Sequence, residues 1–158
     1  MVTALIPGSF NPPTKGHLDI ISRCADVFEN VRVVVIKNTA KVQTFTSDEC
    51  AEMLRIITKD MPNVSVDTAE GLVVDYAKKI GAGVIVKGLR NARDLDFEIQ
   101  MAEANNLMTG IETMLIASRG DNIHISSSLV REIASLGGDI SKFVPPEICK
   151  IITDKFKK

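Results

Sequence analysis

A loop near the start of the chain constrains the possible folds more than any other stretch. Residues 7–17, with the sequence PGSFNPPTKGH, follow a short apolar run at 3–6. Apolar residues then recur at helical spacing, at Leu18, Ile21, Ala25 and Phe28. Because prolines and glycines interrupt regular structure, this pattern predicts a strand, a tight loop and a helix that begins near Gly16 and His17.

The start of a helix is a favourable place for an anion. Its free backbone N–H groups and its positive dipole end attract phosphate. The side-chain donors available beside it are Ser9, Thr14, Lys15 and His17. The loop therefore indicates a phosphate or nucleotide site. The residues alone also permit an ordinary strand-to-helix turn, since neither G-x-x-x-x-G-K-[ST] nor G-x-G-x-x-G occurs in the chain.

Short β-branched runs alternate with amphipathic segments along the rest of the chain. We expect strands at 3–6, 31–36, 64–66, 84–86 and 113–117. Thr46 and Glu49 form a capping box for the second helix, and residues 147–157 form the last one. Strands that alternate with helices require right-handed crossovers. The sequence therefore predicts an α/β fold with a doubly wound, five-stranded parallel sheet in a single domain over residues 1–158.

The helix expected from about Asp94 has its own apolar pattern. The residues that trace its inward face are Leu95, Ile99, Ala102 and Asn106 or Leu107. No apolar stripe of the chain is clearly surplus to the core. The residues alone therefore predict no oligomeric state.

Composition excludes several classes of protein. Nineteen basic and twenty acidic residues leave a formal charge of −1, so no overall charge recruits nucleic acid or a membrane surface. Cys24, Cys50 and Cys149 are too few and too far apart for a disulfide framework or a zinc site. No run approaches the ~18 apolar residues of a membrane span. We expect a cytoplasmic protein with no metal ligands of its own.

Charged and hydroxyl side chains follow the fourth and fifth expected strands. Lys87 and Arg90 come where a buried strand leaves the core, so they need counterions, which phosphates or the carboxylates Asp94, Asp96 and Glu98 could supply. The serines at 126–128 suit a helix cap, and they equally suit a phosphate. Ligands of doubly wound sheets bind beyond the carboxyl ends of the strands, where all these loops meet.

Three motifs carry a resemblance that covers essentially the whole chain. Thr14, Gly16 and His17 resemble the T-x-G-H form of the nucleotidyltransferase signature. Together with K-G-L-R at 87–90 and I-S-S-S-L-V-R-E at 125–132, they resemble the bacterial phosphopantetheine adenylyltransferases. The resemblance implies a Rossmann-like nucleotidyltransferase fold. It also implies transfer of AMP from ATP to 4′-phosphopantetheine, which gives dephospho-coenzyme A and pyrophosphate.

The same resemblance implies roles for individual residues. The catalytic group comprises His17, which would stabilise the transition state, Lys41 and Arg90. The ATP contacts would be Ser9, Phe10, His17, Gly88, Leu89, Arg90, Glu98, Asn122, Ile123, His124, Ile125, Ser126, Ser127 and Ser128. The second substrate would meet Ser9, Lys41, Val73 and Lys87. The family more often has arginine at the position of Lys87, so this chain keeps the charge without the planar fork.

The chain shows no pattern typical of a protein nucleophile, which suits direct in-line attack of one phosphate on another. Mg²⁺ would be held mainly by ATP and water. By resemblance, the partners are ATP, 4′-phosphopantetheine and further copies of the chain in a homohexamer. Two alternatives stay open: another small-substrate nucleotidyltransferase, such as the nicotinamide mononucleotide type, and a non-catalytic nucleotide-binding or flavodoxin-like module.

Overall fold

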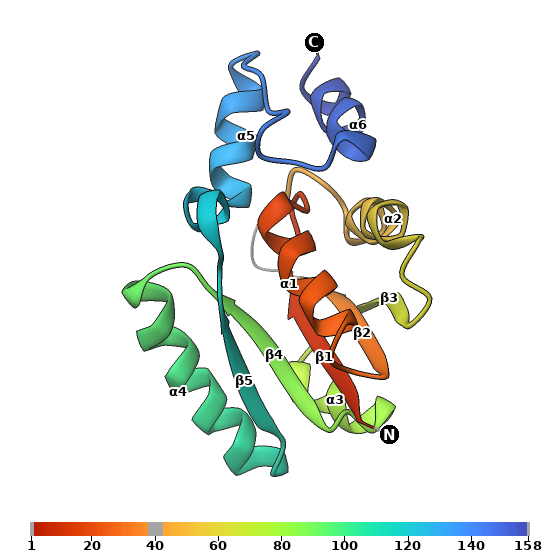
Figure 1. Cartoon of the computed structure of the whole chain (residues 1–158), viewed down its shortest axis with the longest axis vertical. Coiled ribbons are helices and arrows are strands. Elements are labelled where there is room, and N and C mark those ends of the chain that lie inside the picture. Colours follow the sequence, from red (N-terminus) through yellow and green to blue (C-terminus); the bar gives the residue numbers. More distant parts are fainter. Residues whose placement is uncertain (1, 38–42, 158) are drawn as a thin grey trace.

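The computed structural model describes residues 2–37 and 43–157. Its centre is a parallel sheet with the strand order β3-β2-β1-β4-β5 (Figure 1). The strands are β1 (Thr3–Gly8), β2 (Asn30–Ile36), β3 (Val64–Ala69), β4 (Val84–Leu89) and β5 (Glu112–Ala117). The predicted doubly wound, five-stranded parallel sheet is therefore confirmed. Strands β3 and β4 run three residues further than expected, so Lys87 belongs to the end of a strand.

Helices follow the strands as the alternating pattern predicts. They are α1 (Lys15–Ala25), α2 (Ser47–Thr58), α3 (Val73–Ile80), α4 (Ala92–Thr109), α5 (Ser127–Ser135) and α6 (Pro146–Phe156), with a short 3₁₀ turn, η1 (Gly120–His124), before α5. Thr46 and Glu49 form the expected capping box of α2, and Gly81 ends α3 in the left-handed conformation. Figure 1 shows α5 and α6 together at one end of the molecule, beyond the carboxyl ends of the strands.

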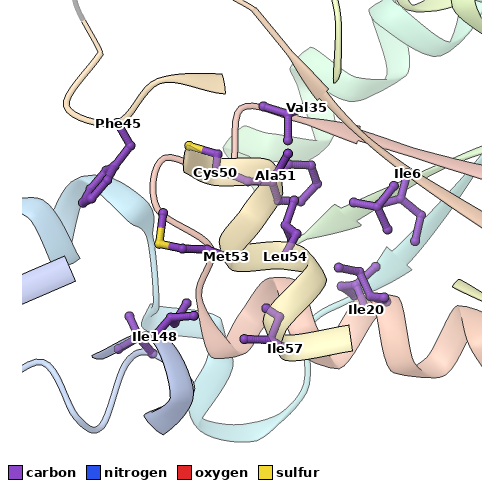
Figure 2. Packing of buried hydrophobic residues seen from close by; sticks show 14 of the residues in the cluster. Ile6, Ile20, Val35, Phe45, Cys50, Ala51, Met53, Leu54, Ile57 and Ile148 are labelled. Atoms are coloured by element: carbon purple, nitrogen blue, oxygen red, sulfur yellow. The ribbon is translucent and has the colours of Figure 1, made fainter. Parts of the chain in front are cut away.

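The two faces of the sheet are covered very unequally. Because neighbouring side chains of a strand point to opposite faces, Ile6 enters one core and Leu5 the other. The larger core joins the sheet to α1, α2, α5 and α6. Figure 2 shows α2 at its centre, with Leu54 and Ile57 packed among side chains from the sheet, α1 and α6. The smaller core lies under α3.

Helix α4 corrects one prediction from the sequence. Leu95, Ala102 and Asn106 are half-buried, as expected for the inward face. Ile99, expected with them, is 50% exposed, and Leu107, the alternative to Asn106, is 80% exposed. The one residue that α4 buries fully is Asn105. The helix carries apolar residues around most of its circumference, so periodicity alone could not select the inward face. The other strongly exposed apolar side chains on α4 are Phe97, Met101 and Met108. Helix α4 therefore exposes apolar surface beyond the core, contrary to the prediction.

The sheet opens between β1 and β4. β1 pairs with β4 only at Ala4–Val84 and Leu5–Ile85, whereas β1 and β2 pair over six residues. From β1 the chain goes outward through β2 to β3, and it then returns to the other side of β1 to form β4 and β5. Such a switch point, at the carboxyl ends of the strands, is where open α/β sheets bind ligands. Across the described residues, no helix is both long and apolar enough to cross a bilayer.

Candidate active site

A cavity of about 530 Å³ lies at the carboxyl ends of β1 and β4. It brings together three segments that are far apart in the sequence: the loop before α1, the end of β4 with the start of α4, and the start of α5. The residues predicted as site residues that line it are Ser9, Phe10, His17, Lys87, Gly88, Arg90, Glu98, Asn122, Ile125, Ser126, Ser127 and Ser128. The tertiary structure therefore gathers most of the predicted residues around one space, and their contacts with ligands remain predictions.

The first loop is shaped by a close contact between Gly8 and Phe10. Phe10 has a positive φ of 45°, which is uncommon for a residue with a side chain, and such strain often occurs at functional sites. Its buried ring lies so close that a Cβ on Gly8 would approach it to 2.9 Å. The ring then meets the His17 imidazole edge-on, with 5.0 Å between the ring centroids. Gly8 and Phe10 therefore fix the orientation of His17 by packing.

Hydrogen bonds set the tautomer of His17. The backbone N–H of Thr14 donates to Nδ1 of His17 at 3.0 Å, so Nδ1 carries no proton and the neutral ring has its proton on Nε2. The Thr14 side chain accepts from the backbone N–H of His17, which completes the capping box of α1. Burial, with the positive charges of Arg90 and Lys87, lowers the pKa of His17 from 6.5 to about 4. His17 is therefore a neutral Nε2–H donor at pH 7.

The two cations of β4 and its following loop are paired with carboxylates of α4. Arg90 donates to Asp94 from its backbone N–H and from Nε, both at 3.1 Å, and Nη1 donates to the carbonyl of Ile125 at 3.4 Å. Lys87 Nζ lies 3.3 Å from Glu98 Oε1. The ion pairing that the sequence left open as an alternative is therefore present. It holds both cations at the cavity wall, where an anion would have to compete with Asp94 and Glu98.

The serine run begins α5 and also joins it to the first loop. Ser126 is the N-cap and accepts from the backbone N–H of Leu129 at 3.1 Å. The Ser127 hydroxyl donates to the carbonyl of Pro12 at 2.7 Å. Ser128 accepts from Arg131 Nη2 at 3.2 Å. The N-terminus of α5 therefore faces the cavity beside the N-terminus of α1, so two helix dipoles favour an anion in the same space.

Several predicted residues lie elsewhere. Leu89, Ile123, His124 and Val73 do not line the cavity, and Lys41 lies outside the described residues. Val73 begins α3 after β3, the outer strand furthest from the gap between β1 and β4. Leu89, the last residue of β4, does not line the cavity, although Lys87 and Gly88 before it do. The structure therefore gives these four positions no place in the cavity wall.

The cavity also has polar lining residues that the sequence analysis did not include in the site. They are Asn11, Thr14, Gln43, Thr44, Asp94, Ser118 and Arg131. Thr14 and Arg131 belong to the motifs themselves, and Asp94 was considered only as a partner of the cations. Asn11, Gln43 and Thr44 carry no motif, so their position became visible only when the loop before α1 and the segment before α2 were placed together.

The described residues contain no group of three or more His, Cys, Asp or Glu side chains placed to hold a metal ion. The cavity carboxylates are Asp94 and Glu98, and both are engaged by cations. Since Mg²⁺ prefers several oxygen ligands in octahedral geometry, these residues do not fit a dedicated magnesium site.

Comparison with known proteins agrees with this architecture. A family model described as cytidylyltransferase-like matches residues 5–133. A solved structure described as a putative nicotinate-nucleotide adenylyltransferase from Vibrio parahaemolyticus superposes with a TM-score of 0.68 over 96% of this chain and 99% of that one. At 19% identity it supports the fold. Fold, cavity and family model together define a nucleotidyltransferase of the cytidylyltransferase-like class.

Full-length relatives narrow this class. The chain is 46% identical to phosphopantetheine adenylyltransferase from Caldanaerobacter subterraneus subsp. tengcongensis, covering 100% of this chain and 99% of that protein. It is 48% identical to the protein of the same name from Symbiobacterium thermophilum, covering 100% and 98%. The chain belongs to the phosphopantetheine adenylyltransferase family, as its motifs indicated.

Proposed function

We propose that this protein transfers the adenylyl group of ATP to 4′-phosphopantetheine, giving dephospho-coenzyme A and pyrophosphate. The observation that carries the proposal is the similarity over the full length to phosphopantetheine adenylyltransferases. The cavity is consistent with it, because two helix N-termini and the cations Lys87, Arg90 and Arg131 line it. Such a site favours phosphate groups and positions them for reaction.

In the proposed reaction, an oxygen of the 4′-phosphate forms a bond to the α-phosphorus of ATP. The bond from that phosphorus to the oxygen bridging the α- and β-phosphates breaks, and pyrophosphate leaves with those electrons. The protein forms no covalent bond. His17 donates its Nε2 proton in a hydrogen bond to the charge that develops on the transferred group, since its Nδ1 already accepts from Thr14.

The two cations would contribute through an exchange of partners. Arg90 and Lys87 are held at the cavity by Asp94 and Glu98, so the guanidinium and ammonium groups already lie at the cavity before a phosphate binds. The α5 N-terminus, with Ser128, supplies further donors beside Arg90, whose Nη1 donates to the carbonyl of Ile125. Lys41 is proposed for the same group on the resemblance alone, as it lies outside the described residues. ATP would enter as its Mg²⁺ complex, with the ion held by the nucleotide and water.

The test is pyrophosphate release from ATP and Mg²⁺ with three acceptors: 4′-phosphopantetheine, nicotinamide mononucleotide and phosphocholine. We expect release with 4′-phosphopantetheine only. His17→Ala should lower kcat by about 10²–10³, the usual cost of removing one donor to a transition-state charge. Asn63→Ala is the control, because Asn63 lies just before β3 and does not line the cavity.

Three other outcomes of this assay would each change a different part of the proposal. Release with a different acceptor would keep the nucleotidyltransferase class and overturn the proposed substrate. No release with any acceptor would favour a non-catalytic nucleotide-binding module. Equal activity of His17→Ala and the wild type would remove His17 from the mechanism and leave the substrate assignment intact.

A homohexamer is part of the same proposal, and α4 offers the surface that would support it. Its exposed apolar side chains are Phe97, Ile99, Met101, Leu107 and Met108. Exposed apolar side chains gathered on one helix are typical of an interface. Leu107→Glu should reduce the mass found by light scattering, whereas Val27→Glu, at a similarly exposed position after α1, should not. An unchanged mass for Leu107→Glu would contradict this use of α4.

A cytoplasmic location is likewise proposed. Cys24 and Cys50 are buried and unpaired, and burial is the largest cause of the rise in their pKa values, to about 11 and about 12. Neutral, buried thiols suit a reducing compartment and need no disulfide partner. Fractionation of the host cell would test this, and recovery outside the cytosol would contradict it.

A further inference from the structure

Asn11 makes an unusual set of contacts for a residue outside all the sequence motifs. Asn11 is only 4% exposed. Nδ2 donates to the carbonyl of Phe45 at 2.6 Å and to Gln43 Oε1 at 3.2 Å, and Oδ1 accepts from the backbone N–H of Phe45 at 3.3 Å. These bonds span 32–34 residues of sequence. The loop before α1 is therefore tied to the segment that leads into α2.

Only an amide can satisfy this arrangement. The side chain must accept from the N–H of Phe45 and donate to the C=O of the same residue, so it needs one acceptor and one donor side by side. The backbone of Phe45 thereby fixes which end of the Asn11 amide is oxygen. The ring of Phe45 is buried and packs edge-on against Phe156 of α6, with centroids 6.3 Å apart. Asn11 therefore bonds to a backbone segment that is itself held by the core.

Asn11 also joins the first loop to the third segment of the site. Its backbone carbonyl accepts from Nη1 of Arg131, in α5. The next carbonyl, that of Pro12, accepts from the Ser127 hydroxyl at 2.7 Å. The residues joined by these bonds, Asn11, Gln43, Ser127 and Arg131, all line the cavity. One buried residue thus connects the loop that carries Ser9 and His17 to two other cavity walls.

We propose that Asn11 is a positioning residue for the adenylyl transfer, an inference that rests on the proposed function. It holds the wall formed by Gln43 and Thr44 at a set distance from His17, and it acts through these groups without touching a reacting atom. Two bound anions react only when their reacting atoms meet at the right distance and angle, and a displacement of ~1 Å can cost ~10²-fold in rate. Loss of the Asn11 amide should therefore lower kcat more than it weakens ATP binding.

Asn63 provides a matched control. It is another asparagine whose Nδ2 bridges distant segments, by donating to the carbonyls of Ala25 at 2.8 Å and Phe28 at 2.9 Å. It lies just before the amino end of β3, at the opposite end of the sheet from the cavity, and it does not line the cavity. Asn63→Ala therefore removes a comparable pair of structural bonds without disturbing the site.

The experiment compares Asn11→Ala and Asn63→Ala in the full chain at a temperature where both are folded. Urea unfolding gives stability, calorimetry gives the Kd for ATP, and pyrophosphate release gives kcat and KM for 4′-phosphopantetheine. We expect both variants to be less stable than the wild type. Only Asn11→Ala should lose at least about tenfold in kcat, with the Kd for ATP within about threefold of wild type.

A second variant covers the case in which Asn11→Ala does not fold. Asn11→Asp keeps the volume and the acceptor for the Phe45 N–H but loses the donor to the Phe45 carbonyl, so its kcat should fall below that of the wild type and of Asn63→Ala. If the kcat of every folded Asn11 variant equals that of Asn63→Ala, the inference is overturned and the function stands. If the wild type itself shows no turnover, both the inference about Asn11 and the proposed function are overturned.

Discussion

Helices α1 and α4 both follow a strand that ends at the cavity, but they are held in different ways. α1 begins with a full capping box and buries Ile20, Ile21 and Cys24 in the larger core. α4 has Asn91 as its N-cap, is attached to the site through ion pairs, and of its 18 residues buries only Asn105. The same strand–helix connection therefore produces α1, which is held by its cap and the larger core, and α4, whose apolar side chains stay largely exposed.

This difference separates two kinds of phosphate-binding group. On the α1 side, His17 is a neutral donor whose ring is fixed by Thr14 and by Phe10, so it needs no rearrangement before it acts. On the α4 side, Arg90 and Lys87 are cations that must leave Asp94 and Glu98 at least in part to meet a phosphate. Preorganised donors are the more efficient of the two for stabilising transition-state charge.

The largest expected effect concerns how tightly α1 and α4 pack against the rest of the molecule. Ile21 on α1 is 0% exposed and Ile99 on α4 is 50% exposed. Ile21→Ala should lower the free energy of unfolding by about 2–5 kcal/mol, because it removes buried methyl groups and leaves a cavity. Ile99→Ala should cost less than about 1 kcal/mol in the monomer. Urea denaturation at a concentration where the protein is monomeric would measure both, and equal costs would break the comparison.

The next prediction concerns the charge of His17. Its pKa is about 4 in the folded protein and near 6.5 when unfolded, so between these pH values the unfolded state binds more protons. Its contribution to stability is therefore present above pH 6.5 and lost as the pH falls towards 4. The free energy of unfolding of His17→Ala should therefore fall less steeply than that of the wild type as the pH drops from 6.5 to 4. The carboxylates contribute equally in both proteins.

Urea midpoints at pH 7, 5.5 and 4 would measure this difference. Nuclear magnetic resonance of the two imidazole rings would check it directly, with His124→Ala used to assign the signals. A His17 ring that titrates near 6.5 would show that α1 presents a cation at neutral pH. The contrast between a neutral α1 side and a charged α4 side would then fail.

A smaller effect is expected from the two helix caps. Thr14 and Asn91 each accept from the third residue of their helix, at 3.4 Å and 3.1 Å. Thr14→Ala and Asn91→Ala should each cost about 0.5–2 kcal/mol. Only Thr14→Ala should also reduce turnover strongly, because its hydroxyl lies 3.1 Å from Nδ1 of His17. A comparable loss of turnover in Asn91→Ala would show that the α4 cap positions the site equally.

The smallest effect concerns the ion pair between Lys87 and Glu98. Glu98→Gln should change the free energy of unfolding by no more than about 1 kcal/mol, because partly exposed pairs contribute little. The difference from wild type should shrink when urea unfolding is repeated at 1 M salt, where the Debye length is about 3 Å. A loss as large as that of Ile21→Ala would mean that this pair, more than packing, holds α4 to the molecule.

Local patterns were sufficient for most of the secondary structure. The capping box at Thr46 and Glu49 was found as predicted. Gly81 after α3 and Pro146 at the start of α6 have equally short-range physical causes. On α4 the pattern placed Leu95, Ala102 and Asn106 correctly and Ile99 wrongly, because apolar residues surround the helix and only contacts with β4, β5 and α3 decide which side is covered.

The sequence by itself determined the alternation of strands and helices, the parallel sheet, and the motif positions that mark the family, since these depend on residues near one another in the chain. Only the tertiary structure decided which loops share a cavity. Val73 follows an outer strand and lies outside it, whereas Asn11 and Gln43 meet across 32 residues of sequence. The neutral charge state of His17 also depends on burial and on the nearby cations Arg90 and Lys87. Contacts between distant segments follow from strand order and packing, which no local pattern encodes.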